Sequence, residues 1–588
     1  MSEPDSRDEL NRATSSVRGE DERWRDCVAL ALAWIPFSLL VAHFWFVTDD
    51  AYISFRYAAN WADGMGLRYN LGEHVAVEGF SNFLWVCVTA SLLKLGLDPV
   101  TWVPAVSALA GFALTGLVYF SLRQHFALNR QLSALTVCAL GCCAPFAVWS
   151  TGGLETMSFT LLLFLVVRAI LLRPGSASGV QAGAFGLLTA LSRPEGIYWV
   201  LLVLALGWSS RRQRGESTQL GASLGILLTG FAVYTAWRLS AFEHALPTSA
   251  TAKLSAGIGV DRLVRGFRYV SMQFLTTLSL FMIVPAAWEA LRPGRRTLAL
   301  PLLALALGFP VWAILVSGDF MAFGRFLVPG LPYLALLSGL ALARLVGPNG
   351  ERRALGVLLA LFVAGLGVLP AWGLYPVPLS VREPLDFRPH LEGYRSESAY
   401  WSQQSTETQR WAERGKALAQ FAEPGDSIAI SAIGAVGYYS RLFVYDRVGL
   451  VTREVAELAP EGDAREHTPG HDNPVEVQWF LNRGERPTFI LANFLEVAEK
   501  ADLLAKVGRA EQLMRTSGLR KFYVLDIREV RAVGQSSAQE SGSFRYLFTW
   551  KLIPKGVTTR SAWDSLEARV QRHLAGEEFP SVEVNETD

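Results

Sequence analysis

The chain has 588 residues, of which 51% are hydrophobic and 18% are charged. A water-soluble protein normally carries about a quarter charged residues, so this composition excludes an ordinary soluble protein. The net charge is +1, and no basic stripe with interleaved aromatic residues occurs, which argues against a nucleic-acid partner. The five cysteines form no CxxC pair, so the sequence does not favour a zinc site.

A polar tail, residues 1–26, precedes a series of long apolar runs. Each of the clearest runs has about 18 to 21 residues, enough for a helix to cross the hydrocarbon core of a bilayer. These runs are Cys27–Val47, Trp102–Leu122, Leu220–Trp237, Leu298–Val316 and Leu355–Trp372. Shorter apolar segments between them bring the predicted number of spans to about eleven. We therefore predict a polytopic α-helical membrane domain over residues 27–374.

Arginine content distinguishes the two sides of the membrane, because Lys and Arg accumulate in cytoplasmic loops. One alternating set of loops holds twelve arginines, at positions 123, 130, 173, 211, 212, 214, 292, 295, 296, 344, 352 and 353. The opposite set has few basic residues for its length. Phe83–Leu97 is short for a span, and we interpret it as a helix in the outer leaflet. The pattern predicts a cytoplasmic N-terminus and an extracytoplasmic C-terminal domain.

Beyond Tyr375 the apolar runs stop, and residues 390–588 alternate between helical and strand patterns. Such alternation predicts a small three-layer α/β domain. Ser405 is a plausible cap for a helix over Thr406–Phe421, and a second helix is predicted over Ala562–Leu574. The predicted strands are Ser427–Ser431, Leu442–Tyr445, Pro487–Leu491, Phe522–Asp526 and Phe544–Leu552. A lone glycine pair, Gly434 and Gly437, is a poor fingerprint of a nucleotide-binding loop.

Charged residues gather in the loops predicted to lie outside the membrane. They are Asp49, Asp50, Glu78, Glu155, Arg193, Glu195, Lys253, Asp319 and Arg325. A charge at a membrane boundary is often a simple helix flank. Acidic and basic residues that converge on one face of a helical bundle, however, indicate a functional site. The sequence thus predicts a site for an anionic ligand at the outer membrane surface.

Several motifs in this order resemble those of GT-C type membrane glycosyltransferases that use polyprenyl-phosphate sugars. The motifs are Asp-Asp-Ala-Tyr-Ile-Ser-Phe-Arg-Tyr at 49–57, Gly-Met-Gly-Leu-Arg-Tyr-Asn at 64–70, Val-Glu-Gly-Phe-Ser-Asn-Phe-Leu-Trp at 77–85, Gly-Leu-Glu-Thr at 153–156, Ser-Arg-Pro-Glu-Gly at 192–196, Leu-Pro-Thr-Ser-Ala-Thr-Ala-Lys at 246–253, Gly-Asp-Phe-Met-Ala-Phe-Gly-Arg-Phe-Leu-Val-Pro at 318–329, and Gly-Ala-Val-Gly-Tyr-Tyr-Ser at 434–440. Together they look most like the branch of the terminal β-(1→2)-arabinofuranosyltransferase. That branch has Pro-Asn-Thr where this chain has Pro247-Thr-Ser, so we carry over the reaction class and not arabinose.

The resemblance implies roles for the charged residues. An acidic residue of the first outer loop is the base in this superfamily, so we predict Asp50 as base, with Asp49 orienting it or binding a cation. The donor phosphate would be bound by cationic side chains, namely Arg325, Lys253, Arg193 and Arg56. Arg193 has an alternative role, which is to fix a loop by pairing with Glu195 or another carboxylate.

Three further carboxylates would line the substrate site: Glu78, Glu155 and Asp319. Asp319 would either orient Arg325 or bind sugar hydroxyls. His74 and His244 lie near carboxylates, which leaves a divalent cation open, and we assign no metal. Acceptor contacts are open to Tyr438, Tyr439, His467 and His471, with core or turn positions as the alternative.

We therefore predict an enzyme that transfers a pentofuranose or hexose, with inversion, from a polyprenyl-phosphate donor to a cell-envelope glycan or lipid-linked acceptor. Two other classes fit a chain with these features. One is a transporter or flippase for lipid-linked sugars. Transporters commonly show internal repeats and helices broken near the bilayer midplane, whereas this chain shows no repeat and its charged motifs cluster at one surface. The other is a non-catalytic binding protein, against which the Asp49–Asp50 pair argues.

Overall fold

The computed structural model describes residues 6–172, 178–214, 219–244, 247–248, 259–277, 280–347, 349–388, 391, 393–458, 474–532 and 544–584. The chain forms two compact units, each made of three segments. The helical unit comprises Met1–Val47, Val100–Thr235 and Ile258–Ser402, and the sheet unit comprises Thr48–Pro99, Ala236–Gly257 and Gln403–Asp588. The first outer loop thus belongs to the same unit as the C-terminal sheet.

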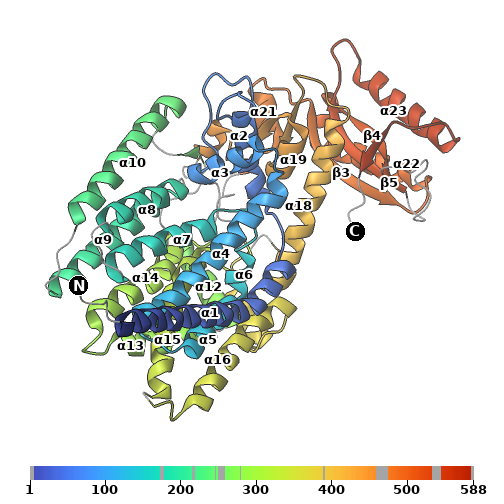
Figure 1. Ribbon diagram of the computed structural model, residues 1–588. Coiled ribbons are helices and arrows are strands. Elements are labelled where there is room, and N and C mark those ends of the chain that lie inside the picture. Colours follow the sequence, from blue (N-terminus) through green and yellow to red (C-terminus); the bar gives the residue numbers. More distant parts are fainter. Residues whose placement is uncertain are drawn as a thin grey trace. The chain divides into compact units, whose positions relative to one another are not determined.

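The helical unit is built from helices of very different lengths (Figure 1). They are α1 (Ser6–His43), α4 (Pro99–Gln124), α5 (Arg130–Gly141), α6 (Ala144–Val148), α7 (Thr156–Val167), η1 (Arg168–Leu172), α8 (Ser178–Ser192), α9 (Gly196–Gln213), α10 (Leu220–Phe242), α12 (Val260–Thr277), α13 (Leu280–Ala290), α14 (Arg296–Leu315), η2 (Arg325–Gly330), α15 (Leu331–Val346), α16 (Arg353–Val368), η3 (Leu369–Trp372), α17 (Leu379–Arg382) and η4 (Glu383–Leu385).

Six helices within the described residues are long and apolar enough to cross a membrane, and a seventh span results if α12 and α13 count as one bent span. They are Glu22–His43, Pro99–Gln124, Leu220–Phe242, Arg296–Leu315, Arg325–Val346 and Arg353–Trp372. The five apolar runs identified in the sequence correspond to five of these helices. The chain is a multi-pass membrane protein, while the total of about eleven spans stays a prediction.

The sheet unit contains a six-stranded mixed sheet with the strand order β2-β1-β3-β5-β4-β6. The strands are β1 (Ser427–Ile430), β2 (Phe443–Asp446), β3 (Phe489–Val497), β4 (Tyr523–Ala532), β5 (Phe544–Leu552) and β6 (Ser581–Val584). β1 is parallel to β2 and β3, β5 is antiparallel to both of its neighbours, and β4 is parallel to β6. Every residue of β1 is buried, as expected for a parallel strand covered on both faces.

Helices cover both faces of this sheet. They are α2 (Asp49–Ala62), α3 (Phe83–Lys94), α18 (Glu397–Ala419), α19 (Gly434–Ser440), α20 (Arg453–Ala456), α21 (Val477–Asn482), α22 (Asp502–Thr516), η5 (Leu519–Lys521) and α23 (Thr559–Leu574). Ile428 and Ile430 pack in one core with residues of α2, α3, α18 and α19. Ala429 points to the opposite core, with α21, α22 and α23. The predicted three-layer arrangement is therefore confirmed (Figure 1).

Several predicted elements differ from the structure in their bounds; among the helices, the one predicted over Ala562–Leu574 begins at Thr559. The helix predicted from Thr406 begins at Glu397, so Ser405 is an interior residue and not a cap. The side chain of Glu397 is held by a distant contact described below, and a local capping pattern cannot reveal such a contact. Phe83–Leu97 forms a helix of only 12 residues, α3, which buries Trp85, Val86, Thr89 and Ala90. The predicted boundary at 375–390 stays a prediction about where the chain leaves the membrane.

Candidate functional site

Asp319 and Arg325 lie at two ends of a buried turn before η2 in the helical unit. Oδ2 of Asp319 accepts a hydrogen bond from Nε of Arg325 at 2.8 Å. Both residues are buried, with exposed fractions of 4% and 6%. The terminal nitrogens of Arg325 have no hydrogen-bond partner within the described residues. Of the two roles predicted for Asp319, the structure thus gives it the contact that orienting Arg325 requires.

The backbone of this turn has an unusual conformation that explains its glycines. Gly318, Phe323 and Gly324 have positive φ angles of 76°, 57° and 57°. A Cβ atom on Gly318 would lie 2.7 Å from the ring of Tyr269, and one on Gly324 would lie 2.6 Å from Cγ of Gln273. Side chains larger than hydrogen are disfavoured at positive φ and could not fit at either position. The two glycines of the 318–329 motif are therefore required by the shape of the turn.

Three residues that we did not predict hold the turn in place. The indole Nε1 of Trp149 donates hydrogen bonds to the carbonyl oxygens of Ala322 and Phe323, each at 3.2 Å. Arg388, which lies before α18, and Glu397, the first residue of α18, contact the same turn. Trp149 lies just before the motif at 153–156, so the sequence could have suggested it as a site residue. Nothing in the sequence around Arg388 and Glu397 distinguishes them from ordinary linker charges.

Arg193 is bound by two carboxylates. Its Nη1 donates to Glu155 at 3.0 Å, and its Nε donates to Glu195 at 2.6 Å. The guanidinium also lies 5.3 Å from the ring centroid of Phe326, the distance at which Arg325 approaches the same ring. The structure therefore brings Glu155, Arg193 and Arg325 into one buried cluster. Arg193 has the loop-fixing ion pairs that the alternative interpretation requires.

Asp49 and Asp50 begin α2 in the sheet unit and have different surroundings. The carboxylate of Asp49 accepts hydrogen bonds from the backbone N–H groups of Gly434 at 3.0 Å and Ala435 at 2.7 Å. These belong to the first turn of α19, whose N–H groups have no partner inside the helix. Burial raises the pKa of Asp49 to about 7, the N–H of Ala435 opposes this shift, and the charge of Asp50 adds to it.

Asp50 is half-buried. Its carboxylate has no hydrogen-bond or ion-pair partner in the part of the chain that the structure describes. The two neighbouring aspartates are thus distinguished by their contacts: Asp49 is occupied by α19, and Asp50 is available.

Arg56, two turns further along α2, contacts the other end of α19. Its Nη1 donates to the carbonyl of Gly437 at 2.9 Å, its Nη2 to that of Leu442 at 2.6 Å, and its Nε to that of Tyr69 at 2.8 Å. The residue is 2% exposed. A phosphate would have to displace these carbonyl groups, so the contact predicted between Arg56 and the donor does not fit this environment. Arg56 instead joins α2 to α19.

The glycine pair of the 434–440 motif lies where α19 meets α2. A Cβ on Gly434 would lie 1.9 Å from the carbonyl oxygen of Asp49, and one on Gly437 would lie 2.0 Å from the Tyr69 hydroxyl. Residues three apart share one face of a helix. The pair therefore allows α19 to pack closely against α2 and against Tyr69 in the loop that follows α2, a role that the sequence alone did not indicate.

Glu78 connects two loops of the sheet unit. Its carboxylate accepts a hydrogen bond from Nη1 of Arg238 at 2.8 Å, and its carbonyl accepts one from the N–H of Thr248 at 2.9 Å. Thr248 is part of the Pro247-Thr-Ser motif, so the two loops that we predict to be the first and third outer loops meet here.

Three predicted residues, Lys253, His467 and His471, lie outside the described residues. His74 and His244 are described. Within the described ranges, however, no three His, Cys, Asp or Glu side chains gather as metal ligands.

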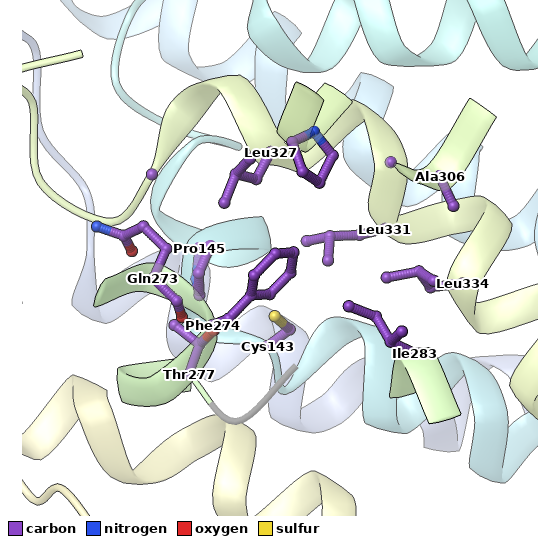
Figure 2. A pocket seen from close by; sticks show the side chains of 13 residues that line it. Cys143, Pro145, Gln273, Phe274, Thr277, Ile283, Ala306, Leu327, Leu331 and Leu334 are labelled. Carbon is purple, nitrogen blue, oxygen red and sulfur yellow. Dashed lines mark hydrogen bonds between the residues drawn. The ribbon is translucent and has the colours of Figure 1, made fainter. Parts of the chain in front are cut away.

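A small cavity lies beside the Asp319–Arg325 turn and includes Gly324 in its wall. Figure 2 shows apolar side chains around it, among them Phe274, Leu327 and Leu331, with the amide of Gln273 at one edge. Both amide atoms of Gln273 are buried and have no hydrogen-bond partner within the described residues. The cavity is therefore apolar with one polar edge.

The fold is similar to solved structures of ArnT from Cupriavidus metallidurans, one bound to undecaprenyl phosphate and one in the apo state. Each comparison has a TM-score of 0.51 and 15% sequence identity, and covers 89% of this chain and 97% of the ArnT chain. Residues 398–534 match a family model described as a domain of unknown function, DUF8728. Comparison with curated proteins gives no match. The chain thus has an ArnT-like fold, a helical membrane region with a C-terminal α/β domain.

Proposed function

We propose that this protein is a membrane glycosyltransferase that moves a sugar from a polyprenyl-phosphate donor to a glycan or lipid-linked acceptor on the outer face of the membrane. The observation that carries the proposal is the fold shared with ArnT over nearly the whole chain, since one ArnT structure holds undecaprenyl phosphate. The ordered motifs of the GT-C superfamily support the same reaction class.

Arg325 is the residue we assign to the donor phosphate. Its terminal nitrogens are available for two phosphate oxygens, and Asp319 holds its Nε. Fixed cations aimed at the leaving phosphate stabilise the charge that develops there. Arg193 would add positive charge to the same cluster, and Glu155 would act by holding Arg193. Lys253 remains a predicted phosphate ligand from the third outer loop.

Asp50 is the residue we assign as base. The acceptor hydroxyl oxygen attacks the anomeric carbon while Asp50 takes its proton. The bond from the anomeric carbon to the phosphate oxygen breaks, and its electron pair leaves with polyprenyl phosphate. Attack opposite the leaving group inverts the anomeric centre. Asp49 would position Asp50 by joining α2 to α19, a role supported by its two N–H donors.

The sugar is not specified by these features. The arabinofuranosyltransferase branch rests on sequence motifs alone, so both pentofuranoses and hexoses belong in the donor panel.

The first experiment is sugar transfer by the purified protein in lipid nanodiscs, with a panel of defined polyprenyl-phosphate sugars. We expect the wild type to turn over one donor and Asp50→Asn to lose about 10²- to 10⁴-fold in kcat, the usual contribution of a general base. Asp49→Asn should retain more activity than Asp50→Asn. If no donor is turned over but a lipid-linked sugar crosses the bilayer, the protein is a transporter, and if it only binds, it is a binding protein.

A further inference from the structure

Arg388, in the segment that leads into α18, forms a buried ion pair with Glu397, the first residue of that helix. Nη1 and Nη2 of Arg388 donate to the two oxygens of Glu397 at 2.9 and 3.0 Å. The residues are 2% and 1% exposed. The rings of Phe387 and Tyr400 each lie 4.3 Å from the guanidinium. Two parallel hydrogen bonds and two aromatic neighbours fix this pair in one geometry.

The remaining hydrogen-bonding groups of the pair contact the backbone of the Asp319–Arg325 turn. Nε of Arg388 donates to the carbonyl of Phe320 at 3.0 Å, and its Nη2 also approaches that of Met321 at 3.4 Å. An oxygen of Glu397 accepts from the N–H of Phe323. The turn thus receives an acceptor and two donors from one ion pair.

Side chains, and not a helix or sheet ladder, bind the backbone of this turn. The carbonyl groups of four consecutive residues, 320 to 323, accept hydrogen bonds from Arg388 or Trp149. Phe323 has a positive φ angle. A residue other than glycine keeps such a backbone conformation only when its surroundings impose it. The hydrogen bond from the N–H of Phe323 to Glu397 holds the backbone at that residue. Removal of the pair would release the turn at its most constrained point.

Stability alone is a weak explanation for such a pair. Two charges that leave water lose hydration, and replacement of a buried ion pair by apolar residues is often neutral or stabilising. A buried pair that fixes one geometry at a binding loop has a different use, since misplacement of a binding group by about 1 Å can cost on the order of 100-fold in rate.

We propose that Arg388 and Glu397 are positioning residues for the donor phosphate. The pair holds the backbone of residues 320–323, this backbone sets the separation and direction of Asp319 and Arg325, and Arg325 contacts the phosphate. The inference rests on the proposed function, because it assigns the pair to the phosphate end of that reaction. Neither residue touches substrate.

The test compares Glu397→Gln with Glu289→Gln in the full-length protein. Glu289 is a matched control, because it is also 1% exposed, lies in the helical unit and accepts two hydrogen bonds from one arginine, Arg344, at 3.1 and 3.2 Å. For each variant, thermal unfolding, hydrogen exchange of a peptide covering 318–330, and the KM values for donor and acceptor are measured. Arg388→Lys is the second test variant, since it keeps the charge but loses the planar fork.

We expect Glu397→Gln and Arg388→Lys to raise the donor KM by about 10- to 100-fold, to leave the acceptor KM unchanged, and to accelerate exchange at 318–330. Glu289→Gln should lower the unfolding temperature without either change. Wild-type donor KM and exchange in the two test variants, or equal effects in Glu289→Gln, would overturn the proposal.

A separate measurement distinguishes this inference from the proposed function. Undecaprenyl phosphate binding is measured directly for wild type and variants, with no sugar transfer involved. If wild type binds it without catalysing transfer, the enzyme assignment fails, and selective loss of binding in Glu397→Gln still supports the positioning role. If wild type does not bind it, the positioning role fails as well.

Discussion

A lysine at position 325 would keep the positive charge but lose the bond by which Asp319 orients it. We expect Arg325→Lys to raise the donor KM by roughly 10- to 100-fold, since a hydrogen bond to a charged group contributes about 1.5 to 3 kcal/mol. Steady-state kinetics with donor varied at saturating acceptor measures the effect. Arg344→Lys, which alters the pair with Glu289 instead, is the control and should leave the donor KM unchanged. An unchanged donor KM in Arg325→Lys would remove Arg325 from the phosphate site.

The Asp49 carboxyl should make stability depend on pH in a defined window. Its pKa rises from the ordinary 3.8 to about 7 in the folded protein, mainly through burial. Between these values the folded state binds more protons at this group than the unfolded state, so this group lowers stability as pH rises from about 4 to about 7. Below and above this window its effect is constant.

Asp49→Asn removes that titration, although the amide also loses one of the two acceptor contacts to α19. We therefore expect the unfolding temperature of wild type, relative to Asp49→Asn, to decline from pH 4 to 7 and then to level off. Thermal unfolding in detergent across this range measures the difference. A difference that stays constant with pH would mean that the pKa of Asp49 is not raised.

For single residues, the sequence showed which charged side chains lie in the predicted outer loops. It did not show which groups they contact. The Asp49–Asp50 pair stood out by its motif. Its division into an occupied and an available carboxylate depends on Gly434, which is 385 residues away. Arg56 fits the motif of a charged outer-loop residue equally well, yet its guanidinium is enclosed by carbonyl groups. Contacts of this separation leave no local pattern.

At the scale of elements, the close approach of α19 to α2 and the loop that follows it can be tested by substitution of a glycine. A Cβ at position 437 would overlap the Tyr69 hydroxyl, so we expect Gly437→Ala to destabilise the protein by about 1 to 3 kcal/mol, the usual cost of overpacking. Gly508 in α22 has nothing within 4 Å of its Cβ position. Gly508→Ala should therefore stabilise by about 0.4 to 1 kcal/mol through helix propensity. Chemical denaturation compares the two, and equal effects would contradict the close approach.

Five of the six strands were predictable because short apolar runs between turn residues have few other interpretations. The sixth strand, β6, has only four residues and was not predicted. The bounds predicted for β5 match the structure, and those for β1 and β2 differ by one residue at each end or less. β3 and β4 extend several residues beyond their predicted ends. Glu496 of β3 and Arg528 of β4 are charged, yet each pairs with a residue of β5, Arg545 and Leu547 respectively. Pairing with β5 overrides their low strand preference.

At the scale of the whole molecule, the predicted topology can be tested by labelling. In a background without the five native cysteines, a cysteine at Lys555 of the sheet unit should react with a membrane-impermeant maleimide in intact cells, whereas one at Asn349 should not. Both positions are exposed, and Asn349 lies in an arginine-rich loop that the charge bias places in the cytoplasm. Both should react after permeabilisation. The reverse pattern would invert the orientation and exclude an outer-face reaction.

The number of spans was the least predictable feature, because α7, α8 and α9 are too short or too polar to be recognised as spans by length and composition. The sequence also did not reveal which segments form the sheet unit. Hydropathy along the chain changes once, near Tyr375, whereas the structure places residues 48–99, the predicted first outer loop, in the unit of the C-terminal sheet.

The distance along the chain from Asp49 to its partners sets an order of events during biosynthesis. Gly434 follows Asp49 by 385 residues, and at about 5 to 20 residues per second it leaves the ribosome roughly 20 to 80 s later. During this interval Asp49 and Arg56 are already made but lack their hydrogen bonds to Gly434, Ala435 and Gly437. Chains that terminate before α19 would contain every candidate span and still lack these contacts.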